Sequence, residues 1–223
     1  MPVVRLSTAL STNRIEGLQD AFFAIVMTLL ILELKVPEVD TAEGLTWAMI
    51  DVIPHFFSYF LSFLMLAVYW VGHHNQFHYI ERTDRLLLWL NLFFLFTVSL
   101  IPFSTALMNA YSDAYIPHAL YGANIALIGL LSLLHWTYAS HHHRLTSHDL
   151  SAVMVRAVRQ RILVAPVLSL TATVAWFIHP AISFAIFLLI PVYYIWPGKM
   201  DQEWRQPAVP HDDEEFHQVH DEH

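Results

Sequence analysis

The sequence predicts an all-α integral membrane protein with six transmembrane helices. Hydrophobic residues make up 56% of the chain and charged residues 13%, whereas soluble domains contain about 25% charged residues. The charged residues lie mostly outside six long apolar segments, and the Lys and Arg residues alternate between the two ends of these segments. Spans of about 20 residues each fill most of the 223 residues. A sizeable soluble catalytic domain is therefore excluded.

The apolar segments define the predicted spans. They are residues 14–36, 54–72, 86–108, 115–138, 162–178 and 181–196. The last two are short and are separated by His179-Pro180, which predicts a tight helical hairpin. We expect residues 146–161 to form a cytoplasmic extension of the fifth helix, with Thr146 or Ser147 as its N-cap. The membrane domain then covers residues 14–198.

The distribution of Lys and Arg predicts the orientation of the chain. Ten of these residues fall on one side of the predicted spans and only Lys35 falls on the other. The positive-inside rule then places both termini in the cytoplasm and the protein in the cell membrane. Residues 1–13 form a cytoplasmic N-terminus, and residues 199–223 form an acidic tail whose composition is typical of disorder. This tail carries most of the net negative charge, so the acidity does not indicate a nucleic-acid partner.

The first segment has an unusual arrangement of polar and apolar residues. Asp20 lies only about 7.5 Å along the helix axis from Ile25, too close to hydrocarbon for a carboxylate that faces lipid. Ile25, Leu29 and Leu32 follow helical spacing and fall on one stripe, with Thr28 beside it. We therefore expect this helix to be surrounded by protein.

At these residues the chain resembles the prokaryotic members of the transmembrane protein 175 family of potassium channels. The family signature on the first helix is Arg-x-x-x-Phe-Ser-Asp, with a threonine eight residues after the aspartate. The corresponding residues here are Arg14, Leu18, Gln19, Asp20 and Thr28, so Leu18 and Gln19 replace the phenylalanine and the serine. A second similar block contains Tyr69, Trp70, His73, His74 and Phe77, followed by Asn91 and residues 98–108.

The resemblance implies a homotetramer of six-helix subunits around the first helix, conducting potassium ions passively. It implies that Ile25, Leu29 and Leu32 line an apolar constriction, to which Thr28 adds a hydroxyl group unless that group bonds back to the carbonyl of Ala24. The first segment contains no Thr-Val-Gly-Tyr-Gly sequence. Discrimination between ions would then depend on the width of the constriction and on the cost of dehydration. No cofactor and no metal is expected.

Asp20 has two interpretations. The resemblance implies a network at the cytoplasmic end, in which Asp20 and Arg14, with partners such as His73, His74 or Asn91, fix the rotation of the first helix. A lone carboxylate near a span is also a candidate proton relay. We favour the network, because one carboxylate does not form a path across a bilayer.

Other classes of protein remain as alternatives. A secondary transporter or proton-coupled cation exchanger would require inverted repeats and broken helices, and only Pro102 is placed to break a segment. A metal-dependent membrane enzyme would rest on the histidines alone, of which His74 and His78 have the i, i+4 spacing of a metal site. The chain contains no cysteine. The apolar stripe itself is also compatible with lipid or with a neighbouring helix.

Overall fold

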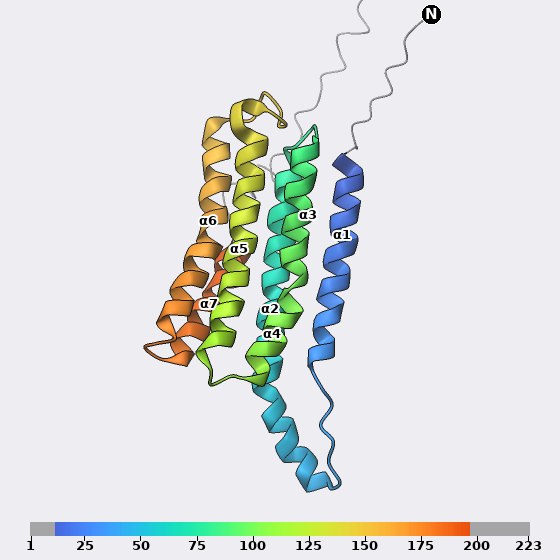
Figure 1. Ribbon diagram of the computed structural model, residues 1–223, viewed down its shortest axis with the longest axis vertical. Helices are drawn as coiled ribbons and strands as arrows, with labels where there is room; N and C mark the ends of the chain where they lie inside the picture. Colours follow the sequence, from blue (N-terminus) through green and yellow to red (C-terminus); the bar gives the residue numbers. More distant parts are fainter. Residues whose placement is uncertain (1–11, 197–223) are drawn as a thin grey trace, which may run out of the picture.

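The computed structural model describes residues 12–196, which are almost entirely helical. The helices are α1 (Thr12–Leu29), α2 (Ala42–His78), α3 (Arg85–Ser99), α4 (Ile101–Ala110), α5 (Tyr115–Ser140), α6 (Ala152–Ala175) and α7 (Pro180–Ile195). Short 3-10 turns, η1 (Leu30–Glu33) and η2 (His141–His143), follow α1 and α5. Because α3 and α4 continue in the same direction, the described residues form six long segments running up and down (Figure 1).

The connections alternate between the two ends of the bundle (Figure 1). The α2–α3 and α5–α6 connections lie at the end where α1 begins, and the α1–α2, α4–α5 and α6–α7 connections lie at the other end. Four of the segments have the length and apolarity to cross a membrane: 12–33, 42–78, 85–110 and 115–143. The chain is therefore a multi-pass membrane protein.

Side-chain caps fix where several helices begin. Thr41 accepts a hydrogen bond from the Gly44 amide at the start of α2, and Ser151 accepts one from Met154 at the start of α6. The ring of His179 accepts a hydrogen bond from the Ala181 amide, directly after the tight turn from α6. These bonds satisfy backbone donors that lack a partner within the helix. Because α6 ends at Ala175 and α7 begins at Pro180, the two helices form the predicted helical hairpin.

Several predicted boundaries were wrong. The first helix stops at Leu29 rather than Val36 and continues only as a 3-10 turn to Glu33. The second begins at Ala42, twelve residues before Pro54, because the proline lies inside a helix of 37 residues. The third is interrupted at Leu100, two residues before Pro102, since proline restricts the residues before it and removes a backbone donor.

The cytoplasmic extension predicted for residues 146–161 also begins later than expected. The helix starts at Ala152, and its cap is Ser151 rather than Thr146 or Ser147. Thr146 instead forms an isolated antiparallel bridge with Ile80, and the Ser147 hydroxyl accepts a hydrogen bond from the Asp149 amide in a turn. Residues 1–11 of the predicted cytoplasmic N-terminus (1–13) and the whole predicted acidic tail (199–223) lie outside the described residues.

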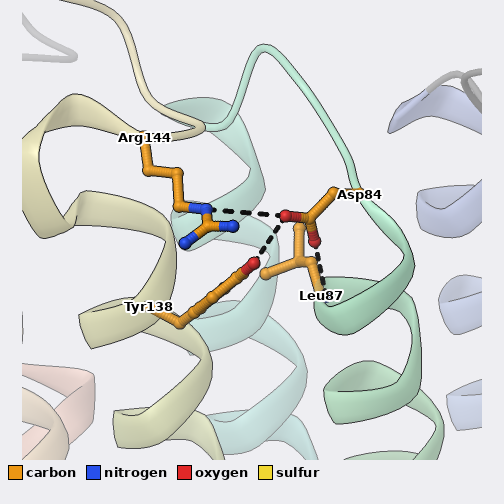
Figure 2. A network of polar contacts seen from close by, with 4 residues as sticks. All are labelled: Asp84, Leu87, Tyr138 and Arg144. Carbon is orange, nitrogen blue, oxygen red and sulfur yellow. Dashed lines mark hydrogen bonds and ion pairs between the residues drawn. The ribbon is translucent and has the colours of Figure 1, made fainter.

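Asp84 joins the α2–α3 connection to the end of α5 (Figure 2). Its carboxylate accepts hydrogen bonds from the Leu87 amide and the Tyr138 hydroxyl, and lies 3.6 Å from Nε of Arg144. The Arg144 guanidinium also lies over the Tyr138 ring, 4.7 Å from its centroid. Partial burial raises the pKa of the Asp84 carboxyl, but the Leu87, Tyr138 and Arg144 contacts outweigh it and the pKa is lowered.

This lowered pKa predicts a loss of stability in acid. The ionised Asp84 stabilises the fold above the ordinary carboxyl pKa of about 3.9, and this contribution disappears as the pH falls through the lower folded-state pKa. Asp84→Asn keeps an N-cap but removes the charge, so we expect the unfolding free energy at pH 7 to fall by about 1 kcal/mol. Thermal unfolding in detergent between pH 3 and pH 7 measures both effects. The stability difference between wild type and variant should shrink below about pH 4, and a constant difference would contradict the assignment.

Candidate functional site

The helix α1 has one buried face and one exposed face. Its buried residues pack against the bundle at spacings of three and four, and the first residue of η1 continues them: Ile15, Gln19, Phe23, Val26 and then Leu30. Ile25, Leu29 and Leu32 are 58%, 45% and 68% exposed in the single chain. Leu18 lies seven residues before Ile25 and therefore belongs to the same exposed face. Residues 12–196 thus leave uncovered the face that the sequence singles out.

The 3-10 turn changes how this stripe ends. Residues three apart in a 3-10 helix lie directly above one another, so Leu32 follows Leu29 without rotating away from it. The Thr28 hydroxyl donates a hydrogen bond to the Ile25 carbonyl at 2.8 Å, rather than to the Ala24 carbonyl considered from the sequence. Thr28 itself is exposed. The stripe therefore combines bulky apolar side chains with one hydroxyl oxygen.

A buried polar chain joins α1 to α2 and α5. The Gln19 side-chain amide contacts Nδ1 of His73 at 2.7 Å, and both side chains are almost fully buried. The His73 ring lies 4.7 Å from the His135 ring, centroid to centroid. Nδ1 of His135 in turn contacts the side-chain oxygen Oε1 of Gln76 at 3.2 Å, and Nε2 of Gln76 donates a hydrogen bond to the Ser132 hydroxyl at 2.7 Å. Gln19 therefore connects α1 to the bundle at the position where the family signature has serine.

Asp20 has a different partner from those expected. The Trp70 indole donates a hydrogen bond to the Asp20 carboxylate at 2.8 Å, and the Trp70 ring stacks on the His74 ring at 5.9 Å. Arg14 is exposed, and within residues 12–196 it forms neither a hydrogen bond nor an ion pair with Asp20. The structure thus joins Asp20 to α2 through the Trp70 indole, which is not among the expected partners Arg14, His73, His74 or Asn91.

Asn91 lies on α3, completely buried, near the same end of the bundle. Neither its amide nitrogen nor its carbonyl oxygen has a partner among the described protein atoms. Burying polar groups without a hydrogen-bond partner costs free energy. The Asn91 side chain is therefore suited to hydrogen bonding with an ordered water molecule. The structure does not join Asn91 directly to Asp20.

Sequence reasoning missed most of the buried polar chain. Trp70 belongs to the second similar block but is not among the predicted anchoring residues, and neither are His135, Gln76 and Ser132. One signal was available: Gln76, Ser132 and His135 are polar residues within long apolar helices, where polar residues require partners. Among residues 12–196, no group of three or more His, Asp or Glu side chains is arranged to hold a metal ion.

The spanning helices and the polar side chains buried between them define a polytopic helical membrane protein. Residues 14–102 match the family model described as "Endosomal/lysosomal potassium channel TMEM175". The chain is 32% identical to a potassium channel of Streptomyces collinus over 188 residues, covering 82% of this chain and 91% of the relative. It is 30% identical to one of Chamaesiphon minutus, covering 82% and 93% respectively.

A solved structure supports the same relationship. The crystal structure of a lysosomal potassium-selective channel TMEM175 homologue from Chamaesiphon minutus superposes with a TM-score of 0.73 at 29% identity. It covers 82% of this chain and 96% of the other. The chain therefore belongs to the TMEM175 family, which is a family of ion channels and not of enzymes. The recognition made from the first-helix residues is confirmed.

Proposed function

We propose that the protein is a homotetrameric potassium channel in the cell membrane, with six spans per subunit and a pore lined by α1. The observation that carries this proposal is the exposed apolar face of α1. Its opposite face is buried against the chain, while Ile25, Leu29 and Leu32 remain uncovered. Each chain contributes one such helix, and a pore on a symmetry axis requires several. The relatives named as potassium channels support the choice of ion.

The proposed pore discriminates between ions through dehydration. Ile25, Leu29 and Leu32 from each subunit would form successive apolar rings that provide no oxygen ligands. An ion that passes them must give up part of its hydration shell, which costs less for potassium than for the smaller sodium ion. The Thr28 hydroxyl oxygen, which already donates its proton to the Ile25 carbonyl, offers a lone pair beside the rings.

The charge distribution supports the proposed orientation. The α2–α3 and α5–α6 connections, which carry Arg82 and Arg144, lie at the end of the bundle where α1 begins (Figure 1). Lys35 lies at the opposite end, after α1. With the arginine-rich end in the cytoplasm, both termini are cytoplasmic. The buried polar chain at His73 then lies toward the cytoplasmic half of the membrane.

Ion flux in proteoliposomes tests the function. The purified protein should conduct potassium passively and faster than sodium, with valinomycin as the positive control for sealed vesicles. A flux that saturates with ion concentration would favour a secondary transporter or cation exchanger. The absence of flux from folded, oligomeric protein would overturn the channel proposal.

We propose that Asp20 anchors α1 and does not relay protons. Asp20→Ala leaves the Trp70 indole without its acceptor, which we expect to cost about 1 kcal/mol and to weaken the tetramer peak in size-exclusion chromatography. Glu16→Ala is the matched control, because Glu16 lies one turn earlier on α1 and forms no hydrogen bond or ion pair within residues 12–196. A stable Asp20→Ala tetramer that has lost only its proton dependence would instead identify a relay.

A further inference from the structure

A crevice of about 190 Å³ lies between α2, α6 and α7. Its walls are mainly apolar and include Ile162 from α6 and Pro191 from α7. Gly72 of α2 also lines it, and a Cβ placed on Gly72 would meet no atom within 4 Å. The space exceeds that of an engineered apolar cavity of about 150 Å³ that accepts benzene. It is therefore large enough for several carbon atoms of an aliphatic chain.

The polar side chains that line the crevice include Arg161 and Asn75, as well as Gln76 and Ser132 of the buried polar chain. Arg161 of α6 donates hydrogen bonds to the backbone carbonyls of Tyr194 and Trp196 at the end of α7, and these bonds hold its guanidinium at that level. Asn75 of α2 also lines the crevice, half-buried, and forms no hydrogen bond with the described residues. Tyr194 and Trp196 are of the type that settles at the headgroup level of a bilayer. The polar part of the crevice thus lies where headgroups meet acyl chains.

The charge around the crevice selects an anion. The described residues of α6 and α7, and residues 64–78 of α2, contain no aspartate or glutamate. A guanidinium at this depth favours a phosphate group as its ligand, and basic pockets between membrane helices bind anionic lipid headgroups. The apolar part of the crevice would otherwise face hydrocarbon with an unfilled gap, which loses dispersion contacts.

We propose that this crevice is a binding site for an anionic phospholipid. One acyl chain lies against Gly72, Ile162 and Pro191, and the phosphate group binds near Arg161 and Asn75. The site is separate from the exposed face of α1 and does not depend on the proposed pore. It requires only that the chain is embedded in a bilayer.

Native mass spectrometry of the full-length protein tests this site. The protein is incubated in detergent with equal concentrations of dioleoylphosphatidylglycerol and dioleoylphosphatidylcholine, which have identical acyl chains. Both lipids carry a phosphate group, but the choline ammonium group of phosphatidylcholine cancels its charge and repels a guanidinium, whereas phosphatidylglycerol keeps a net negative charge. This difference in net charge at Arg161 predicts that wild type retains phosphatidylglycerol about tenfold more than phosphatidylcholine. Equal retention of the two lipids by wild type would overturn the proposal without the need for any variant.

Two pairs of variants locate the site. Gly72→Leu fills the crevice and should reduce phosphatidylglycerol retention about tenfold, whereas Gly17→Leu, at another glycine with no atom within 4 Å of its added Cβ, should not. Arg161→Gln should abolish the preference for phosphatidylglycerol, and Arg161→Lys should keep it. Unchanged retention in Gly72→Leu would overturn the proposal. Lipid binding that appears only in a protein lacking residues 201–223 would also overturn it, because the acidic tail would then be the occupant of the crevice. The same holds if Gly72→Leu changes the oligomeric state but not lipid retention, because a second copy of the chain would then be the occupant.

Discussion

Ile25→Asn should raise potassium conductance and reduce the preference for potassium over sodium. Four Ile25 side chains around the proposed axis form a ring that water wets poorly, and asparagine has a similar volume but carries a carbonyl and an amide. One net hydrogen bond contributes about 0.5–1.5 kcal/mol, and 1.4 kcal/mol corresponds to about tenfold in a rate or equilibrium. A change of roughly tenfold in the permeability ratio is therefore the expected scale. Reversal potentials under a potassium/sodium gradient measure it.

Ile31→Asn is the control for this prediction. Ile31 is also exposed, at 48%, but it lies on a different side of the helix from Ile25. Counting 100° per residue along α1 and 120° in the 3-10 turn, it lies about 80–120° from the stripe of Ile25, Leu29 and Leu32. A selectivity change in Ile31→Asn alone would mean that a different face of the helix lines the pore. If neither variant changes the selectivity, the first helix does not form the selectivity filter.

Gly129→Ala should destabilise the fold strongly. Gly129 lies on α5 where α6 crosses closely, and an added Cβ would lie 2.7 Å from Cδ and 3.1 Å from Cγ of Pro166. The proline ring cannot rotate away, so one of the two helices must move. Overpacking of this kind costs about 1–3 kcal/mol, which corresponds to a decrease in melting temperature of roughly 2–12 °C for a chain of this size. Thermal unfolding of the purified protein in detergent measures it.

Gly72→Ala provides the matched control, because a Cβ there has open space around it. Alanine is the better helix former by about 0.5–1 kcal/mol, so this variant should be as stable as wild type or slightly more stable. If both variants unfold at the same temperature, α5 and α6 do not pack as closely at Gly129 as the structure indicates.

The sequence by itself determined the class of protein, the number of long helical segments and the family. Each follows from local patterns: apolar runs of spanning length, Lys and Arg at alternate connections, and the spacing of Arg14, Asp20 and Thr28 on one helix. The stripe of Ile25, Leu29 and Leu32 could also be identified, because the helical period fixes which residues share a face. That this stripe lines a pore remains a proposal.

Only the tertiary structure decided which side chains become partners. The 3.6-residue period places Gln19 and Asp20 on adjacent faces of α1. It does not indicate which of these two residues contacts His73 on α2. In the structure Gln19 contacts His73, whereas Asp20 accepts a hydrogen bond from Trp70, fifty residues away in the sequence. Helix ends were also decided by tertiary context, as at Pro54, because packing outweighs the local cost of a proline within a helix. Contacts between distant helices depend on how those helices cross, and a one-dimensional pattern does not contain that information.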